Sequence, residues 1–213
     1  MLRTAMKKLL LILAALFSVN AAQAADFVPQ EGKQFITVAQ PATVDKEVIE
    51  FFSFYCPHCA NFQLEYKIPQ TIQAKMPAGT QFVKYHVNFL GRASEDLTRA
   101  WAFAMATNST ELVEDALFEA AQANQINSMA DIRKIFLDKG ISAEQFDNGI
   151  NSFAVNGLVN KQVKALEQYQ VRGVPAFFVN GNKQIDLGGF SDSASVQQFV
   201  DNYADTVLYL LNH

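Results

Sequence analysis

The chain has 213 residues, a formal net charge of -4 and 50% apolar residues, with 18 Phe and 2 Cys. This length and composition support a substantial hydrophobic core in one domain, or in one domain that carries a large insertion. No block of basic residues occurs, which argues against a nucleic-acid-binding surface.

The N-terminus predicts a secretory signal peptide. Basic residues precede an apolar run at positions 9–19, and Ala22-Gln23-Ala24 has the small-residue pattern of a cleavage site. The run is shorter than the roughly 20 residues that a membrane-spanning helix needs. We therefore expect cleavage after Ala24, which removes residues 1–24; an uncleaved N-terminal anchor is the alternative. Export would place the chain in an oxidising compartment.

Strand and helix patterns follow each other in the next part of the chain. Val48 to Phe54 is a nearly continuous β-prone apolar run, which predicts a central strand covered on both faces. From Cys59 onward, apolar spacing predicts a helix that kinks near Pro69, because proline lacks the amide that would bond back one turn. The period-two alternation from Gln81 to Val87 predicts a second strand.

Several short helices are expected between Gly91 and about Gln162. An amphipathic helix with an N-terminal cap should begin at Ser94. Ser128 to Asp131 and Ser142 to Gln145 both resemble capping boxes. Helical spacing continues to Tyr169, so these residues predict a helical cluster of their own.

Strand signals return near the C-terminus. Ala176 to Val179, a turn at Asn180-Gly181 and Gln184 to Leu187 predict a hairpin. The apolar stripe from Val196 to Leu211 predicts a closing helix. With strands and helices at both ends and helices between them, the pattern indicates one α/β domain interrupted by a helical insertion.

The motif Cys56-Pro57-His58-Cys59 is the main functional signal. It lies where a strand gives way to a helix, so the first sulfur faces unpaired amides and the positive end of the helix dipole, which favour a thiolate. Cys-X-X-Cys thiols have pKa values of about 3.5 to 7.5, against roughly 8.5 for a free thiol. Pro57 fixes the backbone, and the His58 ring should add a donor or a positive charge near Cys56. Thiolate stabilisation belongs to the reduced form only, so the disulfide would be an oxidant.

Three other interpretations of the two cysteines compete with redox activity. A purely structural disulfide is a poor explanation, because closing so small a loop would add only roughly 2 kcal/mol to the stability of the fold. A zinc site needs four ligands, yet no second cysteine pair exists, and haem attachment requires His directly after the second Cys. Chance spacing at such a junction is improbable. We expect redox chemistry without a metal or other cofactor.

Three segments together resemble the DsbA family, periplasmic dithiol oxidases of Gram-negative bacteria. They are Glu50 to Cys59, Lys84 to Phe89 and Arg172 to Gly181. The resemblance implies a thioredoxin fold in residues 25–90 and 163–213, with an inserted helical domain in residues 91–162. It also implies periplasmic action on unfolded or folding exported polypeptides with free cysteines. Reoxidation would come from a DsbB-like, quinone-linked membrane partner.

The resemblance also implies roles for individual residues. Cys56 would be the exposed nucleophile joined to substrate in a mixed disulfide, which a second client thiol resolves. The more buried Cys59 would resolve the mixed disulfide that forms on reoxidation. The Val174-Pro175 bond would be cis and lie against the disulfide, where the Val174 backbone can pair with an extended substrate; an ordinary trans proline opening a strand is the alternative.

Glu50 interrupts the apolar strand, and an unpaired carboxylate there would be strongly disfavoured. It either pairs with Lys84 or carries protons to and from Cys59 with a raised pKa, or does both; a strand-edge carboxylate reaching solvent is the alternative. The family's best-known members have a second acid where this chain has Gln63, so proton handling would rest on Glu50 alone. Trp101, which matches a family tryptophan, is expected in the core.

Two rival functions remain open. An isomerase or reductase could use the same dithiol, although known periplasmic isomerases have an added N-terminal domain and only about twenty residues precede the first strand here. A peptide-binding chaperone with an incidental disulfide is the other rival.

Overall fold

The computed structural model describes residues 27–213. The predicted signal peptide and its cleavage after Ala24 lie outside these residues. Within the described part, every helix falls short of the length and hydropathy that a membrane span requires.

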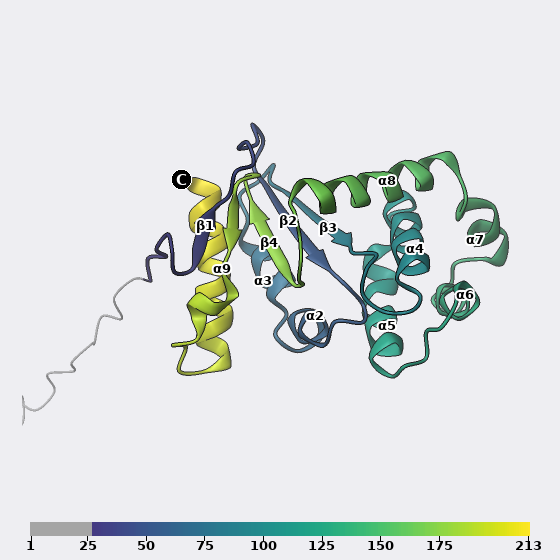
Figure 1. Cartoon of the computed structure of the whole chain (residues 1–213). Coiled ribbons are helices and arrows are strands. Elements are labelled where there is room, and N and C mark those ends of the chain that lie inside the picture. Colours follow the sequence, from purple (N-terminus) through teal and green to yellow (C-terminus); the bar gives the residue numbers. More distant parts are fainter. Residues whose placement is uncertain (1–26) are drawn as a thin grey trace, which may run out of the picture.

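A five-stranded mixed sheet forms the centre of the α/β part, in the order β1-β5-β4-β2-β3 (Figure 1). The interior strand β2 runs parallel to β3 and antiparallel to β4, and β5 runs antiparallel to both β4 and β1. The strands are β1 (Phe35–Thr37), β2 (Glu47–Phe52), β3 (Gln81–His86), β4 (Ala176–Val179) and β5 (Lys183–Ile185).

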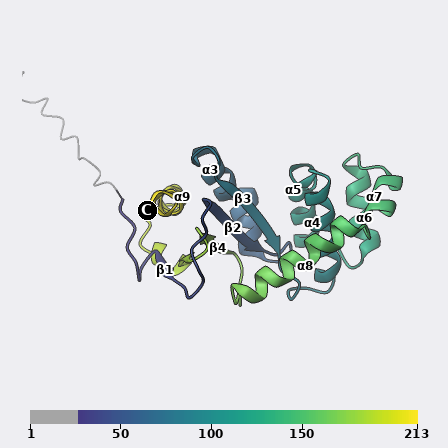
Figure 2. The same cartoon turned by 90° about the horizontal axis from the view of Figure 1, so that it is seen from above.

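One face of the sheet is covered by the helices that surround the cysteine motif. Figure 2 shows α3 and α9 on the same side of the sheet, where they enclose an aromatic and aliphatic core with β4. The elements on this side are α2 (Pro57–Ala60), the π-helical turn η2 (Asn61–Glu65), α3 (Ile68–Lys75), the 3-10 turn η3 (Leu187–Phe190) and α9 (Val196–Asn212).

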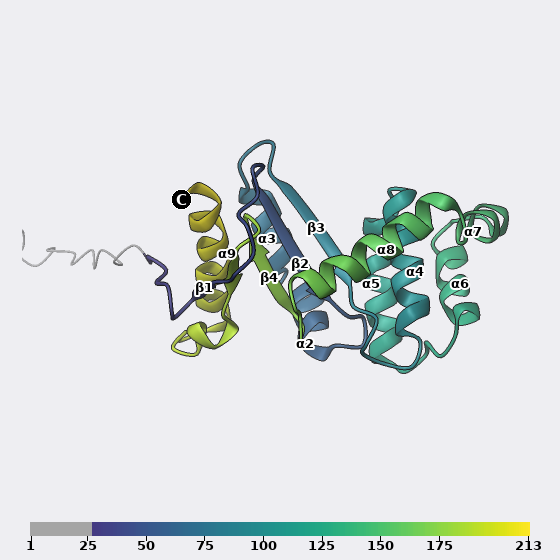
Figure 3. The ribbon, with the colours of Figure 1, turned by 45° about the horizontal axis from the view of Figure 1, so that its top comes forward.

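The remaining helices gather beside β3 and form the inserted block (Figure 1). Figure 3 shows α8 running from the α7 end of this block back to the sheet, where the end of α8 packs on the opposite face from α9. The block consists of α4 (Ser94–Ala106), α5 (Thr110–Gln122), α6 (Met129–Asp138), α7 (Ala143–Gly149) and α8 (Phe153–Gln168).

An aromatic cluster joins the end of β2 to the helical block. The Phe52 ring meets Trp101 of α4 at 5.3 Å and Phe118 of α5 at 5.6 Å between centroids. Phe54 meets the same Phe118 ring at 4.8 Å. Trp101 is buried, as predicted, and its indole N–H donates to the Lys84 carbonyl at 2.9 Å. The segment that leads into Cys56 is therefore held by both parts of the molecule.

The helix predicted after Cys59 is divided differently from the expected kink at Pro69. The chain passes through α2 and η2 and breaks at Lys67, whose backbone is left-handed with φ of 51°. Pro69 lies in the first turn of α3, where the missing amide has no helical partner to lose.

The predicted N-terminal caps are partly wrong. Ser94 is the first residue of α4, with Ala93 at the cap position, and the Ser94 hydroxyl donates to the Asn88 carbonyl at 2.7 Å instead. The Ser128 hydroxyl donates to the Asp131 carboxylate at 3.0 Å and so does not cap the backbone of α6. The capping box of Ser142 and Gln145 is confirmed.

The C-terminal predictions agree with the structure apart from small shifts. β4 has the predicted bounds, and Asn180 and Gly181 both take positive φ in the turn. The second hairpin strand ends at Ile185, because Leu187 begins η3. The helix α8 continues through position 162, the expected end of the insertion. The side chain of Gln162 is buried there. Its oxygen accepts a hydrogen bond from the His86 backbone N–H at 2.9 Å, and its nitrogen donates to the Thr98 carbonyl at 3.1 Å.

Candidate active site

Cys56 is positioned by the junction between β2 and α2. It occupies the N-terminal cap position of α2, and its sulfur accepts the backbone N–H of Cys59 at 3.2 Å. Pro57 takes the first helical position, where its fixed φ suits the helix and its missing N–H is not needed. Both cysteines are free thiols in this structure.

The two thiols have opposite acid strengths. A hydrogen bond from the Cys59 thiol lowers the pKa of Cys56 from 9.0 to about 7, assisted by the backbone N–H groups of Cys59 and His58 and opposed by burial and by the Glu50 charge. Burial raises the pKa of Cys59, and the adjacent Cys56 raises it further. At neutral pH, Cys56 supplies a thiolate and Cys59 holds the proton.

Cys56 is much less exposed than predicted. The residue is 5% exposed and Cys59 is 0% exposed, so only the expected order is confirmed. The cause is the loop before β4, where the Val174 carbonyl oxygen lies 3.3 Å from the Cys56 sulfur and accepts a hydrogen bond from it when the thiol is protonated. The Val174-Pro175 bond in this loop is cis, as expected. The loop covers the sulfur and brings backbone atoms beside it.

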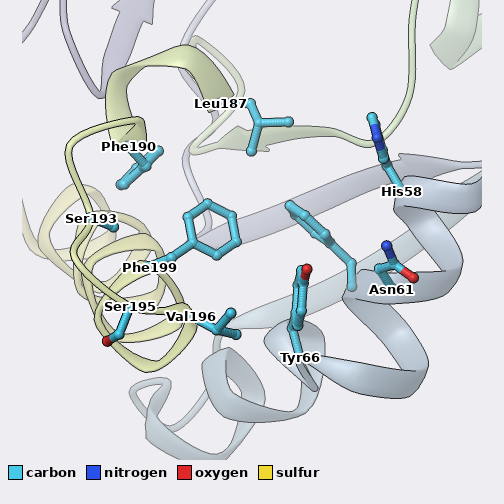
Figure 4. Close-up of a pocket in the computed structure, with 10 residues that line it drawn as sticks. His58, Asn61, Tyr66, Leu187, Phe190, Ser193, Ser195, Val196 and Phe199 are labelled. Atoms are coloured by element: carbon cyan, nitrogen blue, oxygen red, sulfur yellow. The ribbon is translucent and has the colours of Figure 1, made fainter.

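The structure changes the expected contribution of His58. Its backbone N–H helps to lower the pKa of Cys56. Among the hydrogen bonds of residues 27–213, none joins the His58 ring to the Cys56 sulfur; the ring is exposed at the mouth of a groove (Figure 4). The effect of a positive charge on the ring stays a prediction.

Glu50 and Lys84 form the predicted pair. They are directly opposite each other in the parallel register of β2 and β3, so their side chains extend from the same face of the sheet. The Lys84 ammonium lies 3.1 Å from the Glu50 carboxylate. Burial raises the pKa of Glu50 to about 7, although Lys84 opposes the rise. A solvent-exposed Glu50 is ruled out, because the residue is 0% exposed.

Glu114 is a member of this site that sequence reasoning missed. Its carboxylate, from α5, also contacts the Lys84 ammonium, and the Gln63 side-chain oxygen accepts from Lys84 at 2.9 Å. The available signal was an acidic residue on the apolar stripe of α5, between buried Val113 and Leu117.

A groove of about 410 Å³ opens beside the cysteine motif, between α2 and the start of α9. Aromatic and aliphatic side chains surround it, and the polar groups lie mainly at its edges (Figure 4). Phe199 belongs to the apolar stripe that predicted the closing helix, so its ring was expected to face the core. The ring also lines this groove. The lining residues used below are Phe62, Tyr66, Leu187, Phe190, Val196 and Phe199.

The arrangement suits thiol–disulfide exchange. A low-pKa thiolate, a protonated neighbouring thiol and an apolar groove lie together. In the described part of the chain, no group of three or more His, Cys, Asp or Glu side chains has an arrangement that could hold a metal ion.

Comparison with known proteins agrees with this chemistry. The model of the DSBA-like thioredoxin domain family matches residues 47–204. The thiol:disulfide interchange protein DsbA of Haemophilus influenzae is 57% identical over 210 residues, covering 97% of this chain and 99% of the relative. The DsbA of Escherichia coli K12 is 45% identical over 207 residues, covering 96% and 98%.

Solved structures show the same fold. DsbA of Proteus mirabilis with a non-covalently bound peptide, PWATCDS, superposes with a TM-score of 0.83 at 39% identity, covering 88% of this chain and 100% of that chain. DsbA of Klebsiella pneumoniae gives 0.82 at 31% identity, covering 88% and 100%. The chain is a thiol:disulfide oxidoreductase with a thioredoxin fold and a helical insertion, and it belongs to the DsbA family.

Proposed function

We propose that this protein donates a Cys56–Cys59 disulfide to exported polypeptides in the periplasm. A client thiolate attacks the Cys56 sulfur, and the S–S electron pair leaves with Cys59, which takes up a proton. A second client thiolate then attacks the client sulfur of the mixed disulfide and releases Cys56 as a thiolate. The client loses two electrons and gains a disulfide, while the protein gains the two electrons as a dithiol.

The acid strengths of the two thiols carry the proposal. A Cys56 pKa of about 7 makes this sulfur a good leaving group in the second step, when it departs from the mixed disulfide. The raised pKa of Cys59 ensures that the sulfur released first is protonated and cannot readily reverse the attack. Reoxidation requires a disulfide-bearing acceptor, which we assign to a DsbB-like, quinone-linked membrane partner.

The groove and the Val174 backbone would hold the client. An apolar client side chain fits against Phe199 and Leu187, while extended client backbone pairs with Val174 in the loop beside the sulfur. The Proteus mirabilis relative, which binds a cysteine-containing peptide non-covalently, supports a peptide ligand for this chain. We propose His58 and Pro57 as part of the same catalytic segment.

The proposal extends to the whole chain. We propose a monomer whose residues 25–90 and 163–213 form the thioredoxin-like domain and whose residues 91–162 form the insertion, after removal of residues 1–24. The continuity of α8 through position 162 means that the second junction is a helix, not a flexible linker.

A client-oxidation assay tests the function. The oxidised protein should convert a reduced two-cysteine peptide to its disulfide, and Cys56→Ser should abolish the reaction. Cys59→Ser should form, with an activated client disulfide, a Cys56–client mixed disulfide that persists, because the resolving thiol is missing. Client oxidation by Cys56→Ser at the wild-type rate would overturn the proposal, and chaperone activity that survives loss of both cysteines would favour the rival function.

A further inference from the structure

Three charged side chains from three different elements meet in a buried site, and the charge of one of them, Glu50, helps to raise the pKa of Cys59. Glu50 comes from β2, Lys84 from β3 and Glu114 from α5. The Lys84 ammonium contacts both carboxylates, at 3.1 Å from that of Glu50, and its side chain is 9% exposed. Glu50 is 0% exposed and Glu114 is 8% exposed. One cation therefore serves two buried acids.

This charge count leaves one carboxylate without a counterion. With both acids ionised, the site would carry a net negative charge away from water, which is strongly disfavoured. One bound proton removes that charge and leaves the second carboxylate paired with Lys84. Two acids that interact this closely titrate as a pair and not as separate groups.

Glu114 supplies a carboxylate to Lys84 where residue 63 supplies only an amide. The family's second acid is replaced there by an amide, whose oxygen accepts from Lys84 at 2.9 Å and whose nitrogen donates to the Asp115 carboxylate at 2.9 Å. Position 63 of η2 thus offers no carboxylate to Lys84, yet one reaches the same ammonium from α5. The helical block supplies what the active-site helix lacks.

We propose that Glu114 is a positioning residue that shares one proton with Glu50 through Lys84 and so sets the charge near Cys59 during the redox cycle. This inference rests on the proposed function. When Cys59 leaves as a thiolate in client oxidation, the proton of the carboxylate pair passes to its sulfur. In reoxidation the Cys59 proton returns to the pair as Cys59 attacks the mixed disulfide, so no proton is created or lost within the site.

The remaining titratable groups around the site do not replace Glu114. Burial lowers the pKa of His86 to about 3, so this neighbour on β3 stays neutral. Burial raises the pKa of Tyr203 from α9 well above its ordinary value, so it keeps its proton. Burial has the largest effect on Glu114 and raises its pKa; Lys84 lowers the pKa, and Asp115 and Glu111 on α5 raise it. Lys67 lies 3.8 Å from Asp115, at the outer side of the cluster.

Infrared spectroscopy of the full oxidised protein, in which the carboxylate pair holds the proton, tests proton sharing directly, because a protonated carboxyl has its own C=O band. Wild type should show one buried protonated carboxyl that titrates near neutral pH. In Glu114→Gln the like charge is gone, so Glu50 should ionise with an apparent midpoint at least one pH unit lower. Glu50→Gln should lower the remaining midpoint likewise. Glu119→Gln, an exposed change on the same helix, is the matched control and should leave the band unchanged.

Moving the charge back to η2 provides a second variant. Gln63→Glu combined with Glu114→Gln, with Asp115→Asn to avoid two facing carboxylates, should restore most of the lost shift. The pH profile for resolution of a Cys56–glutathione mixed disulfide by Cys59 should move in parallel with the infrared midpoint in each variant.

The outcomes separate this inference from the proposed function. An unchanged infrared titration in Glu114→Gln would overturn proton sharing. A shifted titration with an unchanged pH profile of the Cys59 step would overturn the redox role of Glu114. Failure of wild type to oxidise a client would instead reject the proposed function, and the infrared titration would still decide whether the two carboxyls share a proton.

Discussion

The Cys56 thiolate should make the stability of the reduced protein depend on pH. Its pKa falls from 9.0 to about 7 on folding. A group whose pKa is depressed in the folded state stabilises the fold above the unfolded pKa, and this contribution is lost as pH falls through the folded pKa. The contribution should therefore be complete above about pH 9 and largely absent below about pH 7.

The magnitude follows from the shift. Moving the pKa from 9.0 to about 7 corresponds to roughly 2.7 kcal/mol at 1.36 kcal/mol per pKa unit. Solvent screening at the edge of the site reduces this, so we expect about 1 to 2 kcal/mol. Cys56→Ser removes the titrating group and keeps a small polar side chain in its place.

The assay is urea unfolding of wild type and Cys56→Ser, both kept reduced, between pH 6 and pH 9. The difference in unfolding free energy between the two proteins should change with pH, in favour of wild type, by the stated amount. Burial, the largest cause of the raised Cys59 pKa, is present in both proteins, so the Cys59 thiol should stay protonated in both folded states over this pH range. A difference that stays constant over this range, or that moves toward the variant, would refute a thiolate stabilised by the fold.

Three further results are expected. Cys59→Ala should raise the pKa of Cys56, measured by the ultraviolet absorbance of the thiolate, while Cys59→Ser, which keeps a donor, should raise it less. Identical values in both variants and wild type would exclude the Cys59 hydrogen bond as the main cause. Glu50→Gln should be more stable than wild type above about pH 7, by up to roughly 3 kcal/mol. The Glu50 pKa is raised in the folded protein, so ionisation of Glu50 destabilises the fold as pH rises. In pH-dependent melts the stabilities of the two proteins should converge at about pH 4. Val196→Asp puts a charge on the groove rim at the first residue of α9 and should weaken binding of a cysteine-free client peptide about tenfold, roughly 1.4 kcal/mol. Gln197→Asp in the same turn is the control and should not weaken binding. Equal affinities of both variants by calorimetry would show that the groove does not bind the client.

Local patterns were sufficient to predict the elements that position the dithiol. The apolar run into β2, the strand alternation in β3 and the Asn180-Gly181 turn depend on neighbouring residues, and all three are found. The Glu50–Lys84 pair was also predictable, because an acid in a buried strand needs a partner on the adjacent strand.

Features that depend on distant segments were not predictable. Glu114 reaches Lys84 because α5 packs against α2 and α4 beside the end of β2, and no local pattern places the helical block there. The cover over Cys56 comes from a loop that precedes β4, more than a hundred residues along the chain. The groove likewise forms only where η2, η3 and α9 meet, so Phe199 could be assigned to an apolar stripe but not to a binding surface.

The reduction potential of the Cys56–Cys59 pair tests the central claim most directly. Equilibration with glutathione buffers, followed by acid quenching and mass measurement of the thiols, gives the potential without a client. A fold that stabilises the thiolate predicts a disulfide more oxidising than a glutathione poise of about −220 mV. A potential near the roughly −270 mV of a thioredoxin-like reductase would contradict the assignment of this dithiol as an electron acceptor.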